Sequence, residues 1–126
     1  MQTKIRVTAC HHYRCDREVY QRFKSKVPRS QRMGNVCTQV LSAMMYDDMF
    51  RDMVVANFVE DLSGNYSWVD LRHLTKKVRK EINKGLKELV EVAKNYFNGA
   101  EVTLTGLVTS AFRLIADGKY ALTFDE

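Results

Sequence analysis

The sequence predicts an α+β protein in which a small antiparallel sheet joins both ends of the chain and packs against three to four helices. Three patterns lead to this prediction. Residues 4–9 alternate apolar and polar side chains, as a half-buried strand does. Residues 69–97 repeat apolar side chains at the spacing of an amphipathic helix. Near the C-terminus, the Asp-Gly pair at 117–118 separates two alternating apolar runs, as in a β-hairpin. We expect a single domain, 1–126.

The first half of the chain is expected to be mostly helical after the N-terminal strand. Asp16 is a good cap for a short helix over residues 17–26, because its carboxylate can accept hydrogen bonds from unpaired backbone N–H groups. Pro28 is expected to end that helix. Residues 36–62 are apolar on nearly all sides of a helical wheel, with Asn35 as a plausible N-cap, which predicts a buried helix.

Acidic side chains interrupt this apolar segment at Asp47, Asp48 and Asp52. The segment therefore either breaks into two helices there or has one end in contact with something outside the domain. Carboxylates four residues apart share a helix face and can bind a divalent ion, but such a cluster is more often a solvated break.

The longest expected helix runs from about residue 69 to residue 97. Residues 67–70 (Ser-Trp-Val-Asp) fit the S-x-x-D form of a capping box at its start. Asn98 and Gly99 provide a stop signal at its end. Its apolar side chains fall in one arc of the helical wheel: Leu71, Leu74, Val78, Ile82, Leu86, Leu89, Val92, Ala93 and Tyr96.

The C-terminal segment has two interpretations. We expect strands that form a hairpin around Asp117 and Gly118, because both residues tolerate the positive φ of a tight hairpin turn. This hairpin would pair with the N-terminal strand. In the alternative, residues 106–117 form a helix and Gly118 is the residue that follows its C-cap.

Several features predict a cytoplasmic protein that does not enter a membrane. The N-terminal residues contain no apolar segment of the kind found in signal peptides. No stretch approaches the roughly 18 uncharged apolar residues of a membrane span. The three cysteines are an odd number, which in a chain without a secretion signal favours free thiols in a reducing compartment.

The net charge of +5 is unevenly distributed along the chain. Residues 1–34 carry a net charge of +7, residues 35–70 of −5, residues 71–98 of +5 and residues 99–126 of −2. Such blocks predict separate positive and negative surfaces. A positive surface favours an acidic partner, most commonly nucleic acid. In the alternative, the blocks neutralise each other across the fold.

A row of basic side chains is the most ordered feature of the expected long helix. On a helical wheel it lies beside the apolar arc and consists of Arg72, Lys76, Arg79, Lys80, Lys87 and Lys94. With Arg29 and Arg32, this row is the candidate nucleic-acid interface. Because lysines outnumber arginines in the row, we expect contacts to phosphates rather than bidentate base recognition. The alternative is a solvated face that keeps the protein soluble.

A second candidate surface is rich in methionine. Its residues are Met44, Met45, Met49, Met53 and Phe50, and methionine suits adaptable contacts with a partner. If one side of this helix stays exposed, it is an interface with another protein or with a second copy of the chain. The alternative is an ordinary hydrophobic core.

The segment "TACHHYRC" places two cysteines and two histidines close together. Cys10, His12, Cys15 and Cys37 are conceivable zinc ligands, but the spacing is not that of a zinc knuckle, and we expect no metal or other cofactor. A thiolate at Cys10 or Cys15, activated by a neighbouring histidine, would be the nucleophile of an enzyme. The other interpretation is a small buried cysteine followed by surface histidines.

The main functional prediction is a small non-enzymatic binding or regulatory protein whose basic surface engages an acidic partner, with nucleic acid favoured over an acidic protein surface. The chain contains no phosphate-binding loop, dinucleotide-binding motif or serine-hydrolase motif. The alternative is an inhibitor or adaptor that binds proteins through the methionine-rich helix, with a homodimer as a further possibility. In its compact size, its charge blocks and its lack of catalytic motifs, the chain resembles the small accessory proteins of phages and mobile elements.

Overall fold

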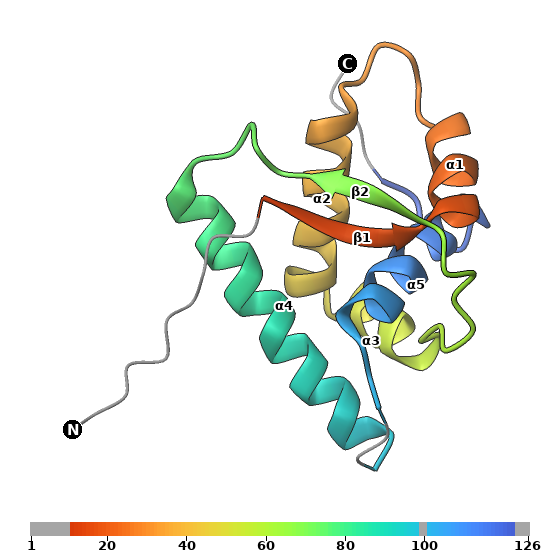
Figure 1. Ribbon diagram of the computed structural model, residues 1–126, viewed down its shortest axis with the longest axis vertical. Coiled ribbons are helices and arrows are strands. Elements are labelled where there is room, and N and C mark those ends of the chain that lie inside the picture. Colours follow the sequence, from red (N-terminus) through yellow and green to blue (C-terminus); the bar gives the residue numbers. More distant parts are fainter. Residues whose placement is uncertain (1–10, 99–100, 123–126) are drawn as a thin grey trace.

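The computed structural model describes residues 11–98 and 101–122. In this part of the chain, five α-helices pack with one two-stranded antiparallel sheet, so the predicted α+β class is confirmed (Figure 1). The number of helices exceeds the expected three to four. In chain order the elements are β1 (His12–Asp16), α1 (Arg17–Ser25), α2 (Met33–Tyr46), α3 (Asp48–Ala56), β2 (Tyr66–Asp70), α4 (Lys76–Tyr96) and α5 (Leu104–Ala116).

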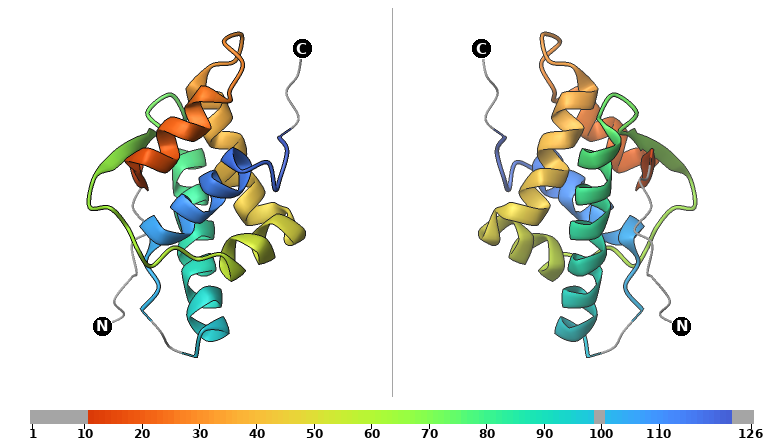
Figure 2. Two further views of the ribbon diagram at one scale, coloured as in Figure 1. Left: turned by 90° about the vertical axis from the view of Figure 1, so that its right-hand side faces the viewer. Right: turned by 90° about the vertical axis from the view of Figure 1, so that its left-hand side faces the viewer.

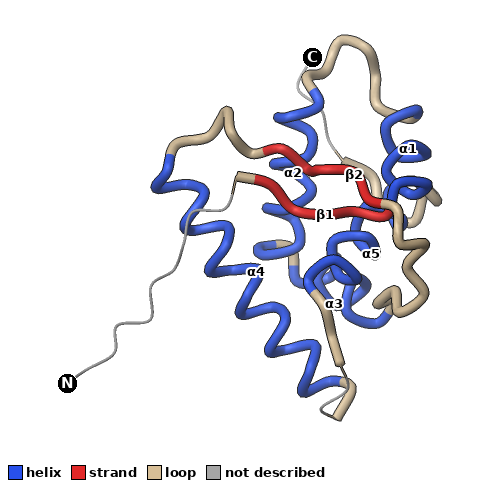
Figure 3. The backbone as a smooth tube through the Cα atoms, viewed as in Figure 1, coloured by secondary structure: helices blue, strands red, loops and turns tan. Residues whose placement is uncertain are grey.

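The sheet pairs β1 with β2, two segments that are separated in sequence by three helices (Figure 3). The pairing is antiparallel and runs from His12 opposite Asp70 to Asp16 opposite Tyr66. A backbone hydrogen bond from Leu71 N to His11 O, 2.8 Å long, extends it by one step. The expected strand at residues 4–9 lies outside the described residues.

The prediction of a helix starting at residue 69 is wrong, because residues 66–70 form β2 instead. Val69 lies fully buried opposite Tyr13, and burial across the paired strands outweighs the local capping-box signal. The helix α4 begins at Lys76, where the Thr75 side chain accepts a hydrogen bond from Val78 N. It ends at Tyr96, close to the expected stop.

The predicted C-terminal hairpin is also wrong. Residues 104–116 form the helix α5, and no strand follows β2 within the described residues. Every residue from Gly106 to Phe112 is buried. The helix therefore has no polar face in this stretch, and its sequence lacks the helical periodicity that would distinguish it from a strand. Gly118, at φ +73°, follows the helix end, with hydrogen bonds from its N to Ile115 O and from Lys119 N to Leu114 O. This is a Schellman motif, the alternative considered from the sequence.

The acidic interruption of the apolar segment does break it into two helices, as one of the two alternatives proposed. Asp47 ends α2 and caps α3, since its side chain accepts a hydrogen bond of 3.1 Å from Phe50 N. The start of α2 differs from expectation, because Arg32 rather than Asn35 is the N-cap. The expected cap of α1 is confirmed: Asp16 accepts a hydrogen bond of 3.1 Å from Glu18 N.

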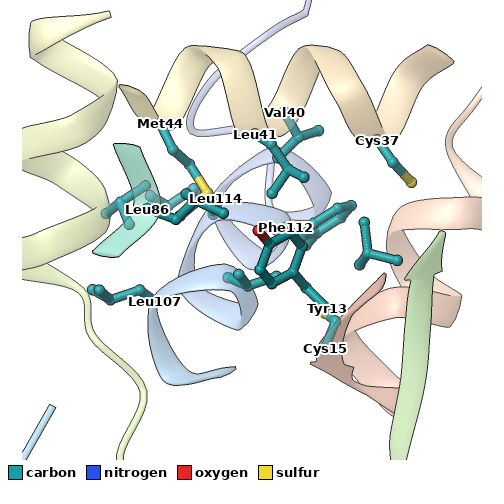
Figure 4. Close-up of a cluster of buried hydrophobic side chains, with 14 of the residues drawn as sticks. Tyr13, Cys15, Cys37, Val40, Leu41, Met44, Leu86, Leu107, Phe112 and Leu114 are labelled. Carbon is teal, nitrogen blue, oxygen red and sulfur yellow. The ribbon is translucent and has the colours of Figure 1, made fainter. Parts of the chain in front are cut away.

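The core surrounds α5, which contacts α1, β1, α2, α3 and α4. Figure 2 shows α5 in the middle of the molecule, with α1 and the sheet on one side and α2 and α3 on the other. Phe112 of α5 is fully buried, and Figure 4 shows it between Leu41 of α2 and the strand residues Tyr13 and Cys15. The sheet therefore covers one side of the core with its inner face, and side chains on its outer face are exposed to solvent.

Candidate nucleic-acid interface

The sheet separates two sets of side chains according to strand alternation. Tyr13, Cys15 and Val69 point inward and are buried. The outer face carries His12 and Arg14 from β1 and Trp68 from β2, all of them exposed. In the antiparallel register Arg14 lies directly opposite Trp68. The outer face is therefore aromatic and basic.

Trp68 is the most unusual side chain on this face, because 53% of its surface is exposed. Its position is defined by two neighbours: the His12 ring packs edgewise with a centroid distance of 4.2 Å, and the Arg14 guanidinium lies 5.5 Å from the indole centroid. Leaving about half of an indole in water forgoes roughly 3 kcal/mol of hydrophobic stabilisation. The cation–π contact returns only about 0.5–1 kcal/mol at an exposed site.

A shallow pocket of about 350 Å³ lies at one end of this face, and it is lined by His11, His12, Trp68, Asp70 and Arg72. Asp70 and Arg72 form an ion pair with an Nη2–Oδ2 distance of 2.7 Å. Hydrogen bonds from the Arg72 side chain and backbone lower the pKa of Asp70 to about 2. At neutral pH the pocket therefore contains a fixed carboxylate that orients the guanidinium of Arg72.

The orientation of α4 relative to the sheet follows from two contacts on opposite sides of the helix. Tyr13 Oη donates a hydrogen bond of 3.1 Å to Asn83 Oδ1. Residue 85 lies about 200° further round the helix, and there Gly85 faces α2, because a Cβ added to it would lie 2.9 Å from Met45 Sδ. The Asn83 side of α4 thus faces Tyr13, on the inner side of the sheet.

Lysines border this sheet-facing side of α4. Residues three or four positions apart on a helix are neighbours, so Lys80 and Lys87 flank Asn83 along the helix. Lys76 continues the same column toward the N-terminus of α4. All three lysines are exposed, and none has an acidic partner in the part of the chain that the structure describes. We call Lys76, Lys80 and Lys87 the lysine column.

The other three members of the predicted basic row are differently placed. Arg72 lies on the turn before α4 and is paired with Asp70. Arg79 is half-buried and its Nη1 donates a hydrogen bond of 2.6 Å to Leu74 O, so it caps local backbone instead of facing a partner. Lys94 lies 3.6 Å from Glu91. Sequence analysis also omitted Lys77 and Lys84, which are exposed on the same helix.

Arg29 and Arg32 are exposed on the connection between α1 and α2. The start of α2 touches the turn before α4, since Thr38 Oγ1 lies 3.2 Å from His73 Nε2. Arg32, the N-cap of α2, therefore lies at the same end of the molecule as the turn that carries Arg72. Arg29 and Arg32 thus share an end of the molecule with Arg72, but no hydrogen bond or ion pair joins them to it within the described residues.

The predicted methionine surface is divided between the core and the solvent. Met44 and Phe50 are fully buried, whereas Met49 is 66% exposed. Met45 and Met53 are half-buried. A groove of about 350 Å³ runs between α2 and α4 beside Met45, with Tyr46 and Val92 on its rim.

The cysteine–histidine cluster does not assemble into a site within the described residues. His12 points outward, whereas Cys15 is buried on the inner face and Cys37 is buried in α2. Burial raises the pKa of the Cys15 thiol to about 12 and that of Cys37 to about 11, so neither is a thiolate at neutral pH. In the described ranges, no three His, Cys, Asp or Glu side chains are placed to hold a metal ion. Cys10 lies outside those ranges.

The aromatic part of this candidate interface was not among the residues predicted from the sequence. Trp68 falls within the capping-box pattern of residues 67–70, which hides the alternation of Tyr66 and Trp68 with Ser67 and Val69. That alternation of aromatic and small or apolar residues is the signal of a strand with one exposed face.

Fold and surface together define a small α+β protein that presents an exposed aromatic and basic sheet face and, on α4, a column of exposed lysines. Comparison with protein families, curated proteins and solved structures found no match. None of the helices in the described ranges is both long enough and apolar enough to cross a membrane.

Proposed function

We propose that this chain is a non-enzymatic binding protein that engages nucleic acid through the outer face of the sheet and the lysine column of α4. The exposed group formed by Trp68, His12 and Arg14 is the observation that supports this most strongly, because it combines an open indole with a neighbouring guanidinium on one face of the sheet. Lysines contact phosphates, and exposed aromatic rings contact bases. The chain exposes both kinds of group, on the outer face of the sheet and on α4, and together they have the chemistry of a nucleic-acid interface.

The arrangement favours contacts to the sugar–phosphate backbone that are independent of sequence. Lys76 and Lys87 are eleven residues apart, which spans about 16 Å along a helix. Three ammonium groups over that length are point charges without the planar fork that reads base edges. Each phosphate that they neutralise releases counterions, so the affinity should fall as the salt concentration rises.

A pair of matched triple variants tests the proposal. The first replaces the lysine column (Lys76→Ala, Lys80→Ala, Lys87→Ala). The control removes the same charge from the ends of α1 and α5 (Lys24→Ala, Lys26→Ala, Lys119→Ala), where all three lysines are exposed. Binding to a fluorescently labelled oligonucleotide is measured by anisotropy from low to moderate salt.

The lysine-column variant should bind more weakly, and the slope of log affinity against log salt should decrease by about 2, since each lost contact removes roughly 0.7. The control should keep a slope close to that of the wild type. Equal losses in both variants would contradict the assignment, because net charge alone would then account for binding.

A second candidate function is contact with another protein chain, and the exposed side chains around the α2–α4 groove favour it. Tyr46, 73% exposed, and Val92, 51% exposed, line this groove, and Met49, three residues after Tyr46, is also exposed. Its lining carries both signs, with Glu81, Lys84 and Glu88 from α4 and Arg51 from α3. A rim of mixed charge can pair with its own copy across a two-fold axis, so a homodimer is the occupant that this surface fits.

Size-exclusion chromatography with light scattering distinguishes the two functions. A dimer that the double variant Tyr46→Ser, Met49→Ser converts to a monomer would support the second function. The 260/280 nm absorbance ratio of the same peak reports nucleic acid that co-purifies. A monomeric wild type at high protein concentration would exclude the dimer.

A further inference from the structure

The outer face of the sheet contains one aromatic ring that is both exposed and held in position. Trp68 contacts His12 edgewise and lies across from Arg14, and half of the indole remains open to solvent. Such a ring is pre-oriented, so a planar ligand that stacks on it does not have to order it first. The adjoining pocket provides the room for such a ligand next to the indole.

From this geometry we infer that Trp68 stacks on an unpaired base, so that the partner is single-stranded nucleic acid and not a duplex. The inference rests on the proposed function. Bases within a duplex are stacked on both faces, and only a base in a single strand, loop or end offers a free face to an indole. Because every base has such a face, the stacking is tolerant of sequence.

Charged groups on both sides of the indole fit the phosphates of the same strand. Arg72 is held by Asp70 at one end of the pocket and keeps most of its side chain exposed. The lysine column begins four residues later, at Lys76. A strand whose base stacks on Trp68 therefore meets cations on the path toward α4. Arg14, on the neighbouring strand of the same face, places a further positive charge next to the stacked base.

Trp68 is the only tryptophan of the chain, so its intrinsic fluorescence reports on this position alone. The probe is a single strand of about 12 nucleotides, within the range that one such surface covers. It is used as DNA and as RNA, and each is compared with the duplex formed with its complement. Stacking should quench the Trp68 emission on addition of either single strand, and the duplex should bind at least tenfold more weakly at equal salt.

Three variants separate stacking from folding and from charge. Trp68→Ala should weaken binding of the labelled single strand about tenfold without changing the salt dependence, since stacking of one base contributes a 5- to 150-fold factor. Trp68→Phe keeps an aromatic ring and should recover part of this loss. Tyr96→Ala is the control: it removes an exposed aromatic ring that is not on the sheet but at the end of α4, and it should bind as the wild type does.

Each alternative result has a clear meaning. Single-strand binding without quenching, equal affinity for the duplex, or an unchanged affinity of Trp68→Ala would overturn the stacking inference and leave the proposed function standing. A chain that binds neither form of nucleic acid would overturn both. Thermal unfolding of the variants identifies any loss of binding that arises from a loss of the fold.

Discussion

The hydroxyl of Tyr13 donates a hydrogen bond of 3.1 Å to the side-chain oxygen of Asn83, a buried contact between residues 70 positions apart in the chain. It connects β1 to the middle of α4. The contact turns one side of α4 toward the sheet, and Lys80 and Lys87 lie beside that side. One buried polar pair thus fixes which side of α4 faces the inner side of the sheet.

Removing this hydrogen bond should destabilise the protein. Tyr13→Phe deletes the donor while preserving the ring, and we expect the free energy of unfolding to fall by about 1–3 kcal/mol because a buried polar group loses a partner. Urea denaturation measures the change. In a double-mutant cycle with Asn83→Leu, the two effects should be strongly non-additive, and simple additivity would show that the pair is not coupled.

Asp16 is expected to contribute stability that depends on pH. Its burial would raise its pKa, but hydrogen bonds from Ser63, Val19 and Glu18 hold the pKa below the ordinary value of 3.8. The native state thus favours the carboxylate, and this contribution is present above pH 4 and is lost as the pH falls below it. Asparagine keeps only one acceptor oxygen for the N–H groups of Glu18 and Ser63, so Asp16→Asn should cost about 1–3 kcal/mol at pH 7, and the difference from wild type should shrink in acid. A difference independent of pH would contradict this.

Gly106 lies where α5 comes closest to the segment that follows α3. A Cβ at this position would clash with the ring of Phe58 and lie 2.6 Å from Val59 O. Alanine normally stabilises a helix interior relative to glycine, but here we expect Gly106→Ala to destabilise the fold by about 2–3 kcal/mol or more. Denaturation curves measure the effect, and a gain in stability would show that the backbone can move away.

Gly118 differs from Gly106 because a Cβ added at Gly118 would contact nothing within 4 Å. Its φ of +73° is the only obstacle to a side chain. Gly118→Ala should therefore cost about 1–2 kcal/mol, the penalty of the left-handed conformation, and Gly118→Asn should cost less, because asparagine adopts this conformation more readily than alanine. The order of the two midpoints in urea tests the Schellman motif at the end of α5.

Cys15 and Cys37 should resist thiol reagents in the native protein. Both are buried, and burial raises both pKa values well above the usual 9, so the reactive thiolate is scarce. Mass spectrometry after treatment with iodoacetamide at pH 8 should find both residues unmodified until the protein unfolds. Because the raised pKa values favour the protonated thiols of the native state, stability should decline as the pH rises above about 9. Rapid native labelling of either residue would contradict their burial.

Arg79 should behave differently from its neighbours in the lysine column. Its guanidinium donates to Leu74 O and is half-buried, so Arg79→Ala should lower the free energy of unfolding by about 1–3 kcal/mol. Lys80→Ala should leave stability within about 0.5 kcal/mol of wild type, as an exposed substitution does. Thermal unfolding compares the two variants. Equal stability of both would show that the contact to Leu74 contributes nothing.

Local sequence signals determined those features that depend on one segment alone. Asp16 precedes the first helix as a cap, and the helical periodicity of residues 76–96 was recognisable because that helix is amphipathic. The acidic residues around Asp47 marked the end of one buried helix and the start of the next. Each of these features depends on a helix end or on one apolar arc, both of which are encoded within a few turns of chain.

Tertiary structure decided which segments form the sheet and which surface is exposed. The strand at residues 66–70 exists because Val69 packs opposite Tyr13, more than 50 residues away in the sequence, and a capping-box motif could not report that pairing. The helix α5 is buried on most sides, so its sequence lacks the polar face that would have distinguished it from a hairpin. The exposure of Trp68 also depends on a long-range contact, since it follows from the pairing of β2 with β1. Side-chain alternation and helical periodicity describe one element at a time, whereas the orientation of one element against another is settled only when their buried faces meet.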